Sequence, residues 1–179
     1  MDRTKNNLNN EEVIMSSKKR RVKEIEFDFI KIKQAIKDSD PRSTIYVGCD
    51  SIRKREIVVY VTCIVIHNAS KHGGSLFKAV KVLPNYEKSP KQLRMRLMNE
   101  VQFAAMAALE IIDNLEDRTL RIHLDINSDE TQLSNIVIKE AVGYVLGMTG
   151  IQPDVKPDAW AASITSDKYV RLASSKVKN

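Results

Sequence analysis

The chain of 179 residues lacks the features that define several specialised classes of protein. No apolar run approaches the ~20 residues of a membrane-spanning helix, and no charged-then-apolar leader opens the chain. Neither a membrane protein nor a secreted one is therefore expected. The only two cysteines, Cys49 and Cys63, lie within strand-like apolar runs. We expect both to be buried thiols of a cytoplasmic protein rather than partners in a disulfide.

Histidine and glycine are also scarce, and their scarcity argues against two kinds of site. His67 and His72 flank a predicted turn with no paired cysteines nearby, so a zinc site is not expected. A two-domain ATPase with a glycine-rich phosphate loop is not expected either. The chain has the length of one domain, contains six glycines, and has no such loop.

The composition is that of an ordinary globular domain with a basic leading segment. Apolar residues make up 42% and charged residues 29%, and 179 residues suffice for one core. Residues 1–22 are polar and basic, so we expect a flexible tail followed by a single domain over residues 23–179. Residues 1–24 hold seven Lys or Arg against four acids, which is half of the net charge of +6.

This charge favours an acidic partner, and nucleic acid, either RNA or DNA, is the commonest one. The run Lys18–Arg21 has two interpretations. It is either a solvated, flexible basic segment or an arm that contacts phosphates.

Hydrophobic periodicity predicts a mixed α/β arrangement. A short amphipathic helix is expected where Ile25, Phe29, Ile32 and Ile36 recur at helical spacing, ending near residues 40–43. Strands are expected over 45–50, 56–67 and 76–83, and their short connections indicate an antiparallel meander. The second strand is apolar on both faces, which predicts a central position. The lysines of the third strand suit an edge.

The second half of the chain alternates helices and strands. We expect a helix over 89–114, a strand over 120–126, a helix from Ser128 to residues 149–150, a short edge strand at Val155 and a helix from Asp158 to about residue 174. The strand at 45–50 should lie between the strands at 56–67 and 120–126, and parallel to the latter. The result is a five-stranded mixed sheet with helices on both faces, joined by a right-handed crossover.

Two aspartates end strands of this sheet. Asp50 closes the first strand and Asp125 the fourth, so parallel pairing would bring both to one edge of the sheet. Gly48 shares a face with Asp50 and leaves room there for a helix to approach.

Glu100 lies in the middle of the apolar stripe of the long helix. A carboxylate that faces the sheet costs several kcal/mol unless it is compensated. The inward positions of this helix and of the first strand offer no basic residue. A buried salt bridge is therefore not the expected compensation.

Asp167, in the last predicted helix, is a fourth acid beside a face of small residues. Alone it would be read as a solvated surface acid. Together the four acids suggest one cluster, whose members repel one another unless divalent cations neutralise them. Ligand sets made only of oxygen favour Mg²⁺ or Mn²⁺ over zinc.

The sequence resembles the ribonuclease-H-like superfamily, and more closely the YkuK-type family of predicted ribonuclease-H-like nucleases. The similarity spans roughly residues 25–170, and the block from Lys156-Pro157 to Asp167-Lys168-Tyr169 is its most specific part. The matching segments are VGCDS at 47–51, RLMNE at 96–100, HLDIN at 123–127, GYVLGM at 143–148, KPDAWAAS at 156–163 and DKY at 167–169.

The resemblance implies metal-ligand and catalytic roles for Asp50, Glu100, Asp125 and Asp167. It implies hydrolysis of phosphodiester bonds with two ions, Mg²⁺ or Mn²⁺, in which Asp50 would bridge both ions. Asp125 and Glu100 would complete the shell of one ion and Asp167 that of the other. RNA or an RNA-containing duplex is the substrate that this similarity favours.

Ser51, Lys156 and Lys168 lie near the expected site and are candidates for substrate contacts. Cys49 and Lys168 depart from the residues more usual in the family, Thr and Arg, without removing a carboxylate. A non-catalytic nucleic-acid-binding module of the same fold is the alternative function, since fold alone does not establish activity.

Overall fold

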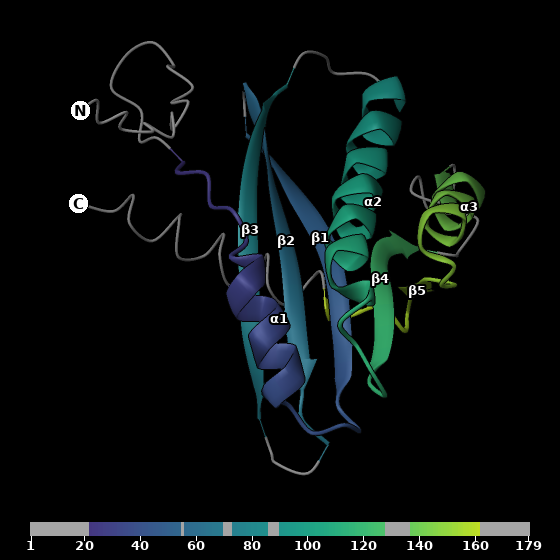
Figure 1. The fold of residues 1–179 in the computed structure, drawn as a ribbon. Helices are drawn as coiled ribbons and strands as arrows, with labels where there is room; N and C mark the ends of the chain where they lie inside the picture. Colours follow the sequence, from purple (N-terminus) through teal and green to yellow (C-terminus); the bar gives the residue numbers. More distant parts are fainter. Residues whose placement is uncertain (1–21, 55, 70–72, 86–89, 128–136, 162–179) are drawn as a thin grey trace, which may run out of the picture.

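The computed structural model describes residues 22–54, 56–69, 73–85, 90–127 and 137–161, and the statements below concern these residues (Figure 1). They form a five-stranded sheet in the order β3-β2-β1-β4-β5. The elements are α1 (Phe29–Asp38), β1 (Thr44–Lys54), β2 (Ile57–His67), β3 (Gly74–Pro84), α2 (Pro90–Ile112), β4 (Thr119–Asn127), α3 (Ile138–Thr149) and β5 (Asp154–Lys156).

The pairing of the strands is the one expected from the sequence. β1 and β2 are antiparallel, as are β2 and β3, whereas β4 is parallel to β1 and β5 is parallel to β4. β2 is buried along almost its whole length because its apolar residues face both sides of the sheet. β3 is an edge strand, and its Lys78 and Lys81 are exposed. The prediction of a mixed five-stranded α/β sheet is confirmed.

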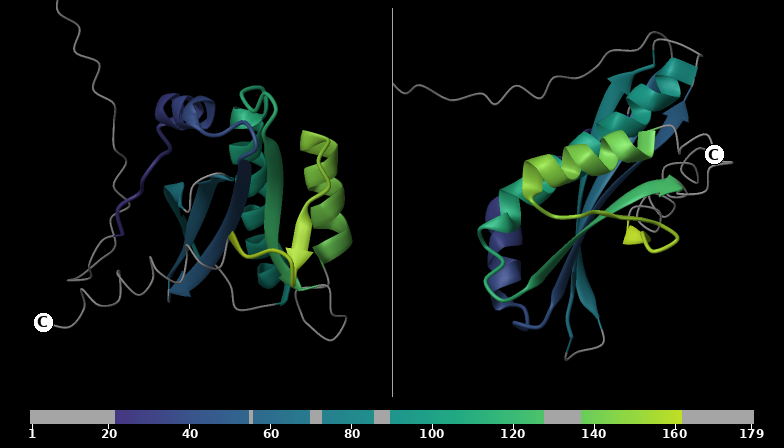
Figure 2. Two further views of the ribbon diagram at one scale, coloured as in Figure 1. Left: turned by 90° about the horizontal axis from the view of Figure 1, so that it is seen from below. Right: turned by 90° about the vertical axis from the view of Figure 1, so that its right-hand side faces the viewer.

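One face of the sheet carries the main core. Ile45, Val47 and Cys49 of β1 pack there against α1, α2 and α3, and all three helices lie on this side (Figures 1 and 2). The other face carries a smaller cluster of valines from β2 and β3. The last predicted helix, from Asp158 to about residue 174, lies outside the described residues except for its beginning. Asp158 itself is in a turn, and helical backbone begins at Ala161.

Two boundaries within the described residues differ clearly from those expected, and the helix start expected at Ser128 lies outside the described residues. α1 begins at Phe29 rather than near Ile25, because the Asp28 side chain accepts a hydrogen bond from the Lys31 amide and caps the helix there. Ile25 instead forms a bridge with Val80 of β3 on the other face. The first strand does not end at Asp50 but continues to Lys54 along β2. Asp50 therefore lies inside β1.

Candidate functional site

Asp50 and Asp125 lie where β1 and β4 part. The parallel pairing of the two strands runs from Thr44–Thr119 to Cys49–Leu124 and ends there. Asp50 and Asp125 are the next residues on their strands. They share one face of the sheet because side chains alternate along a strand. Both are partly buried. The separation of the strands, rather than the end of β1, creates the edge at which these two acids meet.

Glu100 reaches the same place from the opposite face. It projects from α2 toward the sheet and is only 5% exposed. Its Oε1 accepts a hydrogen bond from the Ser51 hydroxyl, whose side chain points to the α2 face while that of Asp50 points away. The expectation that Glu100 faces the sheet is confirmed. The three acids thus approach the gap between β1 and β4 from both sides of the sheet.

The electrostatics of Glu100 reflect this setting. Burial raises the pKa of Glu100 to about 8, and the negative charges of Asp50 and Asp125 also raise it. The Ser51 hydrogen bond and the Arg96 guanidinium oppose the rise without cancelling it. At pH 7, without a bound cation, Glu100 is therefore mostly protonated. A cation placed between these carboxylates would favour the ionised form.

Arg96 is a site residue that sequence reasoning missed. It lies one turn before Glu100 on α2, and its Nη1 donates to both the backbone oxygen and the hydroxyl of Ser51 at 3.3 Å. We expected no basic residue at the inward positions of α2 and β1, and Arg96 reaches Ser51 from beside those positions. A long arginine side chain extends toward the N-terminus of its helix and along the sheet, beyond the stripe defined by its Cα position. Its spacing of four residues from Glu100 is the signal that would have identified it.

Lys156 is the other cation at the site. Its Nζ forms an ion pair with Oδ1 of Asp125, which is 14% exposed, and 42% of the lysine side chain is exposed. β5 brings it there, because Lys156 pairs with Asn127 at the end of β4. Ser51 and Lys156, both predicted near the site, lie there. Lys168 and Asp167 fall outside the described residues.

The carboxylates of the site already have partners in this structure, and this bears on whether they could hold a metal ion. Among the described residues, no group of three His, Cys, Asp or Glu side chains is arranged as a ready metal site. Glu100 is engaged by Ser51, and Asp125 by Lys156. The donor chemistry nevertheless fits Mg²⁺ or Mn²⁺, because Asp50, Glu100 and Asp125 offer only oxygen atoms and Glu100 is buried without a full counter-charge.

The face that carries Asp50 and Asp125 also holds the start of the last helix. Gly48 lies in register between His123 of β4 and Cys63 of β2. His123 Nδ1 accepts hydrogen bonds from the amides of Trp160 and Ala161, at 3.2 and 3.1 Å, and the Cys63 thiol donates to the Ala161 oxygen. The two cross-strand neighbours of Gly48, His123 and Cys63, thus hold residues 160–161 against this face of the sheet.

His123 is the second residue that the sequence analysis missed. It is fully buried, and its ring packs against those of Tyr46 and Trp160. Burial lowers the pKa of His123, although Asp154 opposes the shift. A neutral imidazole can accept hydrogen bonds at Nδ1, as observed here. The signal in the sequence was a histidine two positions before Asp125, and therefore on the same strand face.

The sheet order and the parallel β1–β4 pair define a mixed α/β fold with acids where these two strands part. The family model described as Ribonuclease H-like matches residues 29–171, and the chain belongs to this family. No curated protein and no solved structure matches the chain. Family membership supports a nuclease or nucleic-acid-binding function. None of the helices in the described ranges has the length and apolar character needed to span a bilayer.

Proposed function

We propose that this protein is a metal-dependent nuclease that hydrolyses phosphodiester bonds of nucleic acid by a two-metal-ion mechanism. The observation that supports this most is Glu100. A carboxyl group is buried beside two further carboxylates at the parting of β1 and β4, and its pKa is about 8. Structural charges are rarely left in such a setting, whereas catalytic sites often contain them. RNA or an RNA-containing duplex is favoured because of the family resemblance.

Asp50, Glu100 and Asp125 would hold the ions together with Asp167 from the last helix. When bound, Mg²⁺ or Mn²⁺ would supply activation of a water molecule and neutralisation of phosphate charge. Ser51 would orient the Glu100 carboxylate through its hydroxyl, and Arg96 would hold Ser51 in place. Asp50, Ser51, Arg96, Glu100 and Asp125 all belong to a strand or helix of the described fold, which favours precise alignment.

Lys156 would have two partners in this proposal. Without metal it compensates Asp125. When Asp125 binds an ion, the ammonium group would be released and could contact a phosphate of the strand. The basic segment Lys18–Arg21 would add phosphate contacts, and it lies outside the described residues.

The alternative is a nucleic-acid-binding module of the same fold without catalysis. The Lys156–Asp125 ion pair favours it, because a lysine that permanently occupies a ligand position would exclude the metal. All four acids are present in the sequence, and this favours the nuclease.

The test is cleavage of labelled single-stranded RNA, single-stranded DNA, hybrid and branched substrates with Mn²⁺ or with EDTA. The variants are Asp50→Asn and Asp125→Asn, with Asp113→Asn as the control. Asp113 is an exposed acid that follows α2. Each site variant should nearly abolish metal-dependent cleavage and retain binding, since the loss of one ligand misplaces the ion. The control should cleave like the wild type.

Cleavage that persists equally in both site variants would indicate a contaminating nuclease. Tight binding by the wild type without cleavage of any substrate would establish the non-catalytic alternative.

A further inference from the structure

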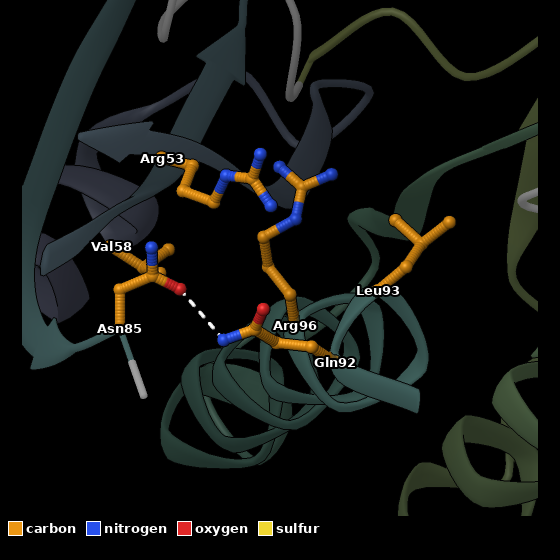
Figure 3. A pocket seen from close by; sticks show the side chains of 6 residues that line it. All are labelled: Arg53, Val58, Asn85, Gln92, Leu93 and Arg96. Carbon is orange, nitrogen blue, oxygen red and sulfur yellow. Dashed lines mark hydrogen bonds between the residues drawn. The ribbon is translucent and has the colours of Figure 1, made fainter. Parts of the chain in front are cut away.

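A pocket of about 340 Å³ lies on the α2 side of the sheet, between α2 and the ends of β1, β2 and β3 (Figure 3). Its volume is within the ~300–1,000 Å³ typical of small-molecule sites. It is bounded by the last residues of β1, the first residues of β2, the residue after β3 and the first turns of α2. Its lining consists of Arg53, Val58, Asn85, Gln92, Leu93 and Arg96.

Two guanidinium groups meet in this pocket. Arg53 extends from β1 and Arg96 from α2, and their side chains point toward one another (Figure 3). Arg96 is tied to Ser51. No acidic side chain among the described residues forms an ion pair with either arginine. Two like charges at close range repel one another, and an anion between them would remove that cost.

Gln92 supplies a second, independent indication of a ligand. Its Nε2 donates to Asn85 Oδ1 at 2.7 Å, which fixes the amide against the end of β3. Its Oε1 is buried and has no hydrogen-bond partner among the described residues. Such an acceptor is costly when left unpaired. It calls for a donor from a bound molecule, and Val58 and Leu93 provide an apolar wall beside it.

Hydrogen bonds link the pocket to one of the carboxylates, Glu100. Arg96 lines it and also donates to the Ser51 hydroxyl, and that hydroxyl donates to Glu100. A molecule held by the two arginines would therefore lie two side chains away from the acidic cluster. The connection runs through Glu100, which reaches the sheet from the same α2 side as this pocket.

We propose that this pocket binds one nucleotide unit of the strand whose neighbouring phosphodiester lies at the carboxylates. Arg53 and Arg96 bind the phosphate, and Gln92 Oε1 accepts a hydrogen bond from the sugar or base. The assignment of the bound strand as a substrate rests on the proposed nuclease function. The binding itself does not.

The experiment measures the affinity of a labelled single-stranded RNA oligonucleotide in EDTA over a series of salt concentrations. Arg53→Gln is the informative variant, because Arg53 is exposed at a strand end and its loss should spare the fold. Affinity should fall several-fold, and the slope of log K against log salt should decrease by about 0.7, the value for one phosphate contact on a single strand. Lys54→Gln is the matched control. It removes the same charge from the next, equally exposed residue on the opposite face of β1, and it should leave the slope unchanged.

Gln92→Leu separates the hydrogen bond from the charge. It should weaken binding with an unchanged salt slope, because no phosphate contact is lost. Equal behaviour of Arg53→Gln and Lys54→Gln in both affinity and slope would overturn the proposal, even if the protein cleaves RNA. A reduced slope for Arg53→Gln alone would support the pocket, even if no substrate is cleaved. The two proposals can therefore fail separately.

Discussion

Two buried ionisable side chains, Arg118 and Glu100, have very different hydrogen-bonding environments. Arg118 is 6% exposed and Glu100 is 5% exposed. The Arg118 guanidinium makes five hydrogen bonds, three to backbone oxygens and two to the side chains of Ser39 and Glu116. Within the described part of the chain, Glu100 accepts one hydrogen bond, from Ser51, and the negative charges of Asp50 and Asp125 act on it.

The contrast separates a structural charge from a functional one. Arg118 joins the end of α1 and the residues after α2 to the start of β4. Its guanidinium N–H groups donate hydrogen bonds to backbone oxygens of these segments. Removing such a group is costly because several buried acceptors lose their partner. Glu100 lacks this compensation, which is expected where a ligand completes the site. The following predictions test the contrast in order of expected effect.

The largest effect should come from Arg118→Met. We expect a loss of roughly 3–5 kcal/mol in the free energy of unfolding, the range for removing one member of a buried charged network. Denaturation in urea measures it. Arg42→Met is the control, because Arg42 is exposed and forms an ion pair with its neighbour Asp40, and it should cost less than about 1 kcal/mol. A loss that small for Arg118→Met would mean that its network is not structural.

Glu100→Gln should instead raise the free energy of unfolding of the metal-free protein above neutral pH. The pKa of Glu100 is raised from 4.5 to about 8 in the folded state, so the native protein holds this proton more tightly than the unfolded chain does. Its contribution to stability is present below pH 4.5 and is lost as the pH rises through 8. The glutamine does not titrate. Between pH 5 and pH 9, the free energy of unfolding of the variant should therefore rise relative to that of the wild type by a few kcal/mol.

Unfolding in EDTA at both pH values measures this difference. Glu110→Gln, an exposed acid on the same helix, should show no such change. A Glu100→Gln variant that parallels the wild type at both pH values would contradict the raised pKa.

The smallest effect concerns metal. Mn²⁺ should raise the melting temperature of the wild type, and at 100 times its dissociation constant it would add about 2.7 kcal/mol. Asp50→Asn should blunt the shift because a ligand is lost. Arg118→Met should melt earlier and still show the full shift, since its network is remote from the acids. An undiminished shift in Asp50→Asn would place the ions elsewhere.

The order of the strands could be predicted because it follows from hydrophobic pattern and chain connectivity. The apolar faces of β2 require a central position, and a crossover through α2 brings β4 beside β1. Glu100 could be identified because a lone acid in an apolar helical stripe is conspicuous. These signals are local in sequence and are read directly from residue periodicity.

The missed features depend on contacts that periodicity does not describe. The reach of Arg96 is a property of its rotamer, and the acceptor role of His123 depends on the return of residues 160–161 to the sheet. The extension of β1 to Lys54 follows from its partner β2, whose pairing continues beyond Asp50. The end of the β1–β4 pairing at Cys49 and Leu124 likewise depends on how the two strands are placed in the folded sheet, which residue periodicity does not describe.

The pairing of β1 with β4 also has a consequence for how the molecule folds. The pairing of β1 with β2 reaches Lys54 and Ile57, which are three positions apart in the sequence, and such a local hairpin closes rapidly. The pairing of Thr44 with Thr119 spans 75 positions, since 119 − 44 = 75. Ordering a loop of that size costs entropy before its contacts compensate, so this pairing should form late. The acidic gap therefore does not exist in a half-folded chain. In refolding experiments, metal affinity would report completion of the whole sheet rather than formation of its first hairpins.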